Sequence, residues 1–204
     1  MKAPSYREYT LLLDVGNVLF KMNPQKAWTK ILKHSTHPNL SPTLFLHDGK
    51  LIEFQIGRIH TDQYFFHLRE LLQVHMDLIE FQETWSSIFA PNEDIVTHLS
   101  QLAAIYKLGL LSNTNPAHVQ FLERNFPEIY HYFPDRVYSH DIGFMKPRRE
   151  IFLEAIKENQ NSPEKYIFVD DELSYIKAAQ ELGLKTIHYT SETKLMQALE
   201  KISK

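Results

Sequence analysis

The sequence predicts an α/β fold: a parallel sheet with helices on both faces and a small α-helical insertion near its start. Five short apolar runs have the length of strands, and after residue 90 amphipathic segments of helical length separate them. Strands that alternate with helices form a parallel sheet covered on both faces. Residues 21–90 lack a good strand and contain several amphipathic stretches, which predicts a helical insertion after the first strand.

The elements follow in chain order. We expect strands at Tyr9–Leu13, Ile105–Leu111, Arg136–Ser139, Tyr166–Val169 and Lys185–Tyr189. Helical spacing is found at Ile95–Tyr106, Ala117–Asn125, Arg149–Asn159, Ser174–Leu182 and Glu192–Ile202, and within the insertion at Gln25–Lys33, Thr43–Phe54, Thr61–Leu72 and Leu78–Phe89. Asn115-Pro116 is typical of a helix start, and Gly183 of a helix end. The sequence thus predicts a core domain at 1–20 and 91–204 and an inserted helical domain at 21–90.

Composition excludes several classes of function. The 204-residue chain is 43% hydrophobic and carries a formal charge of −3, so charge does not indicate a nucleic-acid or membrane-surface binder. It has no cysteine, which excludes disulfides, thiolate zinc sites and cysteine nucleophiles. No apolar run approaches the roughly 20 residues of a membrane span, and no signal peptide is evident. We expect a cytoplasmic protein, monomeric or homodimeric, without nucleic-acid or membrane partners.

Polar residues stand where the expected strands end. Asp14 ends the first strand, Ser112 follows the second, Lys146 comes after the third, and Asp170-Asp171 end the fourth. Ligands bind at the carboxyl ends of strands in an open parallel sheet. Carboxylates brought together there need a cation, most naturally Mg²⁺ with oxygen ligands. Such a site suits phosphoryl transfer.

Four motifs in order carry a family resemblance. They are "LLLDVGNVLF", "LGLLSNTNPAH", "DIGFMKPRREIF" and "YIFVDDELSYIKAAQELGLKTIHY", and they extend over about residues 8–190. The chain resembles hydrolases of the haloacid dehalogenase (HAD) superfamily, which implies a Rossmann-like core and a small helical cap over residues 21–90. "EFQIGRI" in the cap, with the first two motifs, is similar to the glucose-1-phosphate-phosphatase-like branch.

The resemblance implies catalytic roles for four residues. Asp14 is expected to be the nucleophile that becomes an aspartyl-phosphate. Ser112 and the backbone amide of Asn113 are expected to hold the phosphoryl oxygens. Lys146 is expected to screen Asp14 from the charge of the phosphate.

The resemblance also implies a Mg²⁺ site. Asp171, Asp170 and the backbone carbonyl of Gly16 are expected to bind the metal together with the nucleophile. From the residues themselves, Asn17 is a candidate to orient water or substrate, and Arg58 in the cap offers a bidentate contact to phosphate or hydroxyl groups.

Two departures from the family pattern leave alternatives open. Gly16 stands where family phosphatases usually have a second Asp that acts as general acid and base, and such a group contributes about 10²–10⁴-fold. Tyr175 stands where an Asp or Asn often supports the metal ligands. We expect a Mg²⁺-dependent phosphatase of a small phosphorylated metabolite, with a sugar phosphate such as glucose 1-phosphate as the best single guess. The alternatives are a phospho-ligand-binding protein with little or no activity and, with less support, a 2-haloacid dehalogenase.

Overall fold

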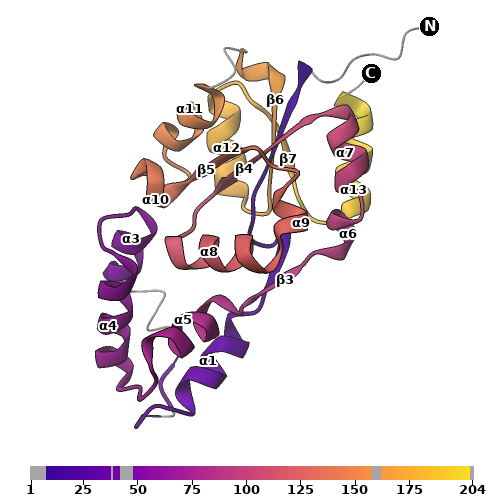
Figure 1. Ribbon diagram of the computed structural model, residues 1–204. Coiled ribbons are helices and arrows are strands. Elements are labelled where there is room, and N and C mark those ends of the chain that lie inside the picture. Colours follow the sequence, from indigo (N-terminus) through magenta and orange to yellow (C-terminus); the bar gives the residue numbers. More distant parts are fainter. Residues whose placement is uncertain (1–7, 38, 42–47, 158–161, 203–204) are drawn as a thin grey trace, which may run out of the picture.

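A five-stranded parallel sheet forms the centre of the core domain (Figure 1). The computed structural model describes residues 8–37, 39–41, 48–157 and 162–202. The strands are β1 (Thr10–Leu13), β4 (Lys107–Ser112), β5 (Asp135–Tyr138), β6 (Tyr166–Asp170) and β7 (Lys185–His188). Their order is β5-β4-β1-β6-β7, and every pair is parallel. The predicted α/β fold is confirmed, and its central strand is the one that Asp14 follows.

Successive side chains of β1 point to opposite faces of the sheet, and both faces are buried. Leu11 and Leu13 belong to one hydrophobic cluster and Leu12 to another, and all three are buried. The first cluster includes residues of α7 (Leu99–Ile105), α8 (Pro116–Asn125), α9 (Pro127–Tyr130) and α13 (Glu192–Ile202), and the second includes residues of α11 (Arg149–Lys157) and α12 (Leu173–Glu181). Helices therefore cover both faces, as a parallel sheet requires.

Four helices of the core begin and end close to the expected positions, whereas Pro127–Tyr130 and Ser139–Ile142 are helices that the sequence did not predict. The helices of the core are α6 (Glu93–Val96), α7 (Leu99–Ile105), α8 (Pro116–Asn125), α9 (Pro127–Tyr130), α10 (Ser139–Ile142), α11 (Arg149–Lys157), α12 (Leu173–Glu181) and α13 (Glu192–Ile202), with a 3₁₀ turn at Pro163–Lys165. The single helix expected at Ile95–Tyr106 is wrong, because the structure has α6 and α7 there. Ser139 was expected to end a strand and instead begins α10. The last two residues expected in Arg149–Asn159 lie outside the described residues.

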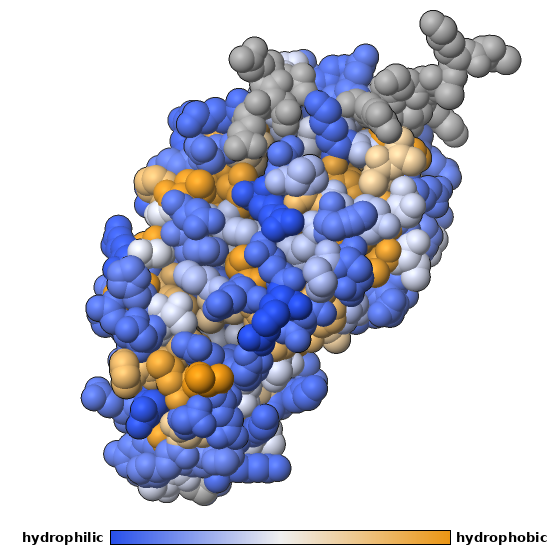
Figure 2. Space-filling model, in the orientation of Figure 1, coloured by the Kyte–Doolittle hydropathy of each residue, from blue (hydrophilic) through white to orange (hydrophobic). Residues whose placement is uncertain are grey.

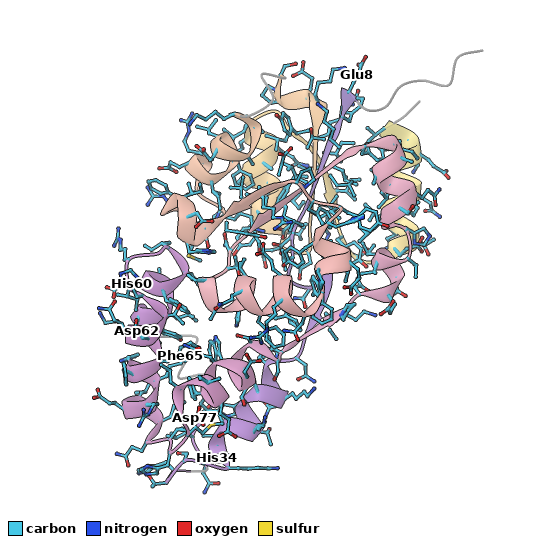
Figure 3. The ribbon with its side chains drawn as sticks, viewed as in Figure 1. Glu8, His34, His60, Asp62, Phe65 and Asp77 are labelled. Atoms are coloured by element: carbon cyan, nitrogen blue, oxygen red, sulfur yellow. The ribbon has the colours of Figure 1, made fainter. Side chains whose placement is uncertain are left out.

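Within the described residues, four helices make up the insertion predicted as a cap, which lies at one end of the core (Figure 1). They are α1 (Pro24–Leu32), α3 (Gly49–Gln55), α4 (Thr61–Leu72) and α5 (Leu78–Ser86). Residues 43–47 of the expected helix Thr43–Phe54 lie outside the described residues. The cap has its own aromatic interior, in which Phe54 and Tyr64 stack at 4.6 Å between ring centroids and Phe65 meets Phe81 edge-on at 4.9 Å. Figure 3 shows Phe65 within the cap and His34 at the end of the cap farthest from the core.

A short antiparallel ribbon connects the cap to the core. Its strands are β2 (Phe20–Met22) and β3 (Phe89–Pro91), which pair Phe20 with Pro91. The sequence prediction of no strand in residues 21–90 is therefore wrong. Each strand has only three residues, too few for an alternating pattern to be recognised. We propose that the boundaries of the cap at 20/21 and 90/91 fall within this ribbon.

The cap also touches the core at α10. Gly57 has a φ of +69°, and a Cβ atom there would lie 2.1 Å from the carbonyl oxygen of His140, so this contact requires glycine. The hydroxyl of the buried Ser139 lies 2.6 Å from the carbonyl oxygen of Gln55 in the cap and accepts a hydrogen bond from the backbone N–H of Thr114 in the core. One hydroxyl thus joins the cap to the loop that follows β4.

The face shown in Figure 2 is largely hydrophilic, with scattered apolar areas. Large exposed apolar side chains among the described residues are Ile52, Phe66, Leu71, Ile79, Leu153 and Leu173. Most of these side chains belong to the cap, so the cap exposes more large apolar side chains than the core does. No helix in the described ranges combines the length and the apolar character needed to cross a membrane.

His118 is buried where the cap meets α8. Its ring stacks on Trp85 of the cap at 5.9 Å between centroids and meets Phe89 edge-on at 5.0 Å. Asn115, the N-cap of α8, accepts a hydrogen bond from the backbone N–H of His118. Burial lowers the pKa of His118 to about 3, so the ring is neutral at physiological pH.

The buried ring predicts a loss of stability in mild acid. The pKa of His118 is lower in the folded than in the unfolded protein, so the unfolded state binds more protons below about pH 6.5. This residue should reduce the free energy of unfolding by up to about 1.4 kcal/mol per pH unit below that value. His118→Phe keeps an aromatic ring but has no titrating group. In urea denaturation, its free energy of unfolding should depend less on pH between pH 4 and 6.5 than that of the wild type. An unchanged pH dependence in the variant would contradict this account.

Candidate active site

Three carboxylates converge at the carboxyl ends of β1 and β6. Asp14 directly follows β1, and its backbone N–H continues the ladder by donating to the carbonyl oxygen of Val169 at 3.0 Å. Asp170 ends β6, and Asp171 is the next residue. One oxygen from each of the three carboxylates lies within 4.8 Å of the others. Glu8 precedes β1 at the opposite edge of the sheet (Figure 3), so the carboxylates stand at the edge that faces the cap.

The ammonium group of Lys146 holds this cluster together. Lys146 Nζ donates to Asp14 Oδ1 at 2.8 Å, to Asp170 Oδ2 at 2.7 Å and to the carbonyl oxygen of Leu111 at 3.0 Å. Only 1% of its side chain is exposed. An ammonium has three N–H bonds, and all three are used.

Aromatic rings enclose the same ammonium group. The ring centroid of Phe168 lies 5.4 Å from Lys146 Nζ, and that of Tyr175 lies 5.1 Å from it. Both distances are within the range of a cation–π attraction. The rings exclude water around the charge and so strengthen its interaction with the carboxylates.

The electrostatics reveal an excess of negative charge. Burial alone would lower the pKa of Lys146, but the carboxylates of Asp14 and Asp170 outweigh it and raise that pKa. Burial raises the pKa of Asp170 to about 6, against the opposing effect of Lys146. Burial also raises the pKa of Asp171. One lysine therefore does not neutralise three carboxylates, and the site favours a further cation.

Ser112 and Asn113 lie beside Lys146 at the end of β4. Ser112 is the last residue of β4 and is buried. The side chain of Asn113 brackets the backbone of Lys146: its Oδ1 accepts from the backbone N–H at 2.7 Å and its Nδ2 donates to the carbonyl oxygen at 2.9 Å. The same Nδ2 lies 3.3 Å from the hydroxyl of Tyr175. The side chain of Asn113 thus positions Lys146, which leaves only its backbone amide for the predicted phosphoryl contact.

The side chain of Met22 packs against Gly16. A Cβ atom on Gly16 would lie 2.7 Å from the sulfur of Met22 and 3.9 Å from Asp14 Oδ2. Met22 belongs to β2, so the ribbon that leads into the cap fills the space beside the expected nucleophile. A longer side chain at residue 16 fits only if Met22 moves.

The two predicted substrate contacts lie in different places. Asn17 is at the carboxylate cluster, where its Nδ2 donates to Asp171 Oδ2 at 3.1 Å. Arg58 lies in the cap turn after Gly57, and its side chain is exposed. The structure thus brings together all the predicted site residues of the core domain and places Arg58 outside the cluster.

Sequence reasoning missed the parts played by Met22 and Tyr175. Tyr175 was noticed only as a departure from the family pattern, although it contacts both Lys146 and Asn113. Tyr175 lies in the first turn of α12, five residues after the Asp at the end of β6, and this closeness to the strand end was the available signal. Met22 carries no such signal, because nothing in the sequence places the cap ribbon against Gly16.

The donor set fits a hard divalent cation. Carboxylate oxygens are the preferred ligands of Mg²⁺, and the three acidic side chains lie close enough to share one ion. Burial raises the pKa values of Asp170 and Asp171, and a cation bound between the carboxylates would favour their ionised forms. Asp14, Asp170 and Asp171 are therefore the residues that would hold such an ion.

Comparison with known proteins identifies the same chemistry. The family model described as haloacid dehalogenase-like hydrolase matches residues 10–183. D-Ribitol-5-phosphate phosphatase of Bacteroides thetaiotaomicron is 27% identical over 187 residues, which cover 86% of this chain and 89% of that protein. Glyceraldehyde 3-phosphate phosphatase of Methanopyrus kandleri is 30% identical over 112 residues, which cover 54% of this chain and 48% of that protein.

A solved structure shares the whole fold. A HAD-family enzyme from Bacteroides thetaiotaomicron, in complex with magnesium and inorganic phosphate, superposes with a TM-score of 0.80 at 26% identity. The match covers 90% of this chain and 94% of that chain.

Replacing Lys146 by Met tests the electrostatic account. Without added divalent cations at pH 8, the variant should lose about 3–5 kcal/mol of unfolding free energy, because two buried carboxylates lose their cation. Lys146 opposes the effect of burial on the pKa of Asp170, which is about 6 in the folded protein, so removing the lysine raises this pKa further and makes ionisation of Asp170 more costly above pH 6. The loss should therefore be smaller at pH 5 than at pH 8 in urea denaturation.

Lys21→Met supplies the matched control, because Lys21 forms an exposed pair with Asp94. This control should show no pH-dependent loss. An equal loss at pH 5 and pH 8 for the Lys146 variant would show that packing, rather than charge, accounts for its effect.

Proposed function

The chain belongs to the haloacid dehalogenase-like hydrolase family, and from this we propose that it is a Mg²⁺-dependent phosphatase of small phosphorylated metabolites. The observation that supports this most strongly is the buried Lys146, bonded to Asp14 and Asp170 at the edge that faces the cap. A fixed positive charge beside a carboxylate lets an anionic substrate approach an anionic nucleophile. Relatives that are themselves phosphatases, from two organisms, support the same reaction class.

In the proposed reaction Asp14 is the nucleophile. One carboxylate oxygen of Asp14 attacks phosphorus, the bond from phosphorus to the ester oxygen breaks, and an aspartyl-phosphate forms. Water then attacks the phosphorus, which releases inorganic phosphate and regenerates the carboxylate. Lys146 stabilises the negative charge in both steps, and Ser112 with the amide of Asn113 holds the phosphoryl oxygens.

We propose that Asp14, Asp170, Asp171 and the backbone carbonyl of Gly16 hold Mg²⁺. When bound, the ion neutralises charge on the carboxylates and on the phosphoryl group. The magnesium and phosphate complex of the related enzyme supports this choice of metal. Asn17 and Arg58 were proposed from sequence as substrate contacts, and Arg58 would need the cap turn to bring it to a bound substrate.

The substrate class is a phosphate ester of a small polyhydroxy compound. The two related phosphatases are named for ribitol 5-phosphate and glyceraldehyde 3-phosphate, both phosphates of primary alcohols. Gly16 favours instead an activated leaving group such as that of glucose 1-phosphate, because no acid at residue 16 can protonate the departing oxygen. The relatives thus favour esters of primary alcohols and Gly16 favours esters with activated leaving groups, so a test of substrate preference needs both kinds.

A phospho-ligand-binding protein with little activity is the second candidate. The sulfur of Met22 occupies the space beside Asp14 that an acid at residue 16 would need, which favours this candidate. The intact cluster of Asp14, Asp170 and Asp171 favours the enzyme. It also disfavours a 2-haloacid dehalogenase, since halide displacement by a carboxylate needs no metal.

A panel of phosphate esters tests the proposal. Ribitol 5-phosphate, glyceraldehyde 3-phosphate and glucose 1-phosphate should each be assayed for phosphate release with Mg²⁺ and with EDTA. We expect turnover of at least one ester that requires Mg²⁺ and falls to the no-enzyme rate in Asp14→Asn. Silence across the panel, with phosphate still raising the melting temperature, would instead support the binding protein, and halide release from 2-chloropropionate the dehalogenase.

Restoring an acid at residue 16 tests the role of Gly16. Because the side chain of Met22 must move to admit a side chain at residue 16, Gly16→Asp is combined with Met22→Ala so that this movement does not enter the comparison. On esters of primary alcohols the kcat of the double variant should exceed that of Met22→Ala by up to about 10²–10⁴-fold. The matched control is Gly16→Asn with Met22→Ala, which has the same shape without the acid. Equal rates for the Asp and Asn variants would show that another group already supplies the proton.

A further inference from the structure

Asn17 has an unusual backbone conformation. Its φ is +55°, and the only other non-glycine residue with a positive φ in the described part of the chain is Gln73. Asn tolerates this left-handed region better than most residues. Two backbone hydrogen bonds fix the turn: Asn17 N–H donates to the carbonyl oxygen of Phe20 at 2.7 Å, and Phe20 N–H donates to that of Val15 at 2.8 Å. The direction of the Asn17 side chain is thus set by a rigid turn.

That side chain reaches across to a distant part of the chain. Asn17 Nδ2 donates to Asp171 Oδ2 at 3.1 Å, and the two residues are 154 positions apart in the sequence. The hydrogen bond therefore ties the turn after β1 to the loop after β6. Asp171 is also held through its backbone, because its carbonyl oxygen accepts from His188 Nε2 at 3.0 Å. The backbone bond does not fix the carboxylate, and the bond from Asn17 does.

The other two carboxylates are oriented in a different way. Asp14 accepts from Lys146, and Asp170 accepts from Lys146 and from the backbone N–H of Glu172 at 2.8 Å. Lys146 has no N–H bond left for Asp171, because its third goes to the carbonyl oxygen of Leu111. A separate donor is needed if the third carboxylate is to point at the other two.

A neutral donor suits this position. A second lysine or arginine beside Asp171 would compensate the negative charge of the cluster and compete with a divalent cation for the carboxylate. The amide of Asn17 fixes the direction of the carboxylate while leaving its charge in place. It bonds only one oxygen, Oδ2, so the other oxygen stays available to a metal ion.

We propose that Asn17 is a positioning residue for the metal site: its amide holds Asp171 so that this carboxylate joins Asp14 and Asp170 around the ion. The inference rests on the proposed function, in which these three residues bind Mg²⁺. It changes the part expected of Asn17 from contact with substrate to orientation of a metal ligand. Groups that support a ligand in this way are typically worth about 10–100-fold in metal affinity.

Asn17→Gly is the variant that isolates the amide. Glycine accepts a positive φ without strain, so the backbone of the turn is preserved while the hydrogen bond is lost. Gln73→Gly is the matched control, because Gln73 has a φ of +48° and an amide side chain but lies at the end of α4 in the cap. Asp171→Asn marks the loss of the ligand itself.

Isothermal titration with Mg²⁺ alone, without substrate, gives a readout separate from activity. We expect the Mg²⁺ dissociation constant of Asn17→Gly to rise about 10–100-fold above wild type, with that of Gln73→Gly unchanged. At saturating Mg²⁺ the kcat of Asn17→Gly should recover, and the KM of the best ester from the panel should stay within about twofold. The melting temperature in EDTA should not fall, since glycine suits the turn.

The outcomes separate the inference from the function on which it rests. Wild-type Mg²⁺ affinity in Asn17→Gly would overturn the inference alone, provided that Asp171→Asn binds Mg²⁺ more weakly. A raised KM with unchanged Mg²⁺ affinity would also overturn it and return Asn17 to substrate binding. If the wild-type protein binds no Mg²⁺, or Asp171→Asn binds it as well as wild type, the proposed metal site itself fails and the inference with it.

Discussion

The ionic contacts of the buried Lys146 are the constraint on which the site depends. Its three N–H bonds connect the ends of β1, β4 and β6 through Asp14, Leu111 and Asp170. A buried ammonium is tolerated only when it is fully hydrogen-bonded and paired, so these strand ends must keep their mutual register. The same charge that holds the carboxylates together also prepares the site for an anionic substrate. The charge of Lys146 thus serves both the packing of the strand ends and the proposed reaction.

The cap is bound to this arrangement through α8 and the loop before it. Ala117 of α8 belongs to the hydrophobic cluster of the cap, and His118 packs between Trp85 and Phe89. Ser139 connects the backbone of the cap to Thr114, two residues beyond Ser112. Any shift of the cap therefore acts on the segment that carries the proposed phosphoryl contacts. The cap reaches the site at a second place, because Met22 of the ribbon β2–β3 packs on Gly16.

Much of the fold and site could be predicted because strand ends carry local signals. The buried apolar runs that form β1, β4 and β6 each end at or just before a polar residue, and parallel topology brings these residues, Asp14, Ser112 and Asp170, to one edge. The ribbon β2–β3 was missed because three-residue strands have no periodicity. The contacts of Asn17 with Asp171 and of Met22 with Gly16 were missed because they join segments whose approach only the folded chain defines.

The central claim is that Asp14 is the residue that accepts the phosphoryl group. A crystal structure grown with Mg²⁺ and beryllium fluoride tests it most directly, because beryllofluoride mimics a phosphoryl group bound to a carboxylate and needs no known substrate. We expect beryllium bonded to a carboxylate oxygen of Asp14, with fluorines facing Lys146, Ser112 and the amide of Asn113. Beryllofluoride bonded to another residue, or Mg²⁺ bound in this site with Asp14 left unmodified, would contradict the claim.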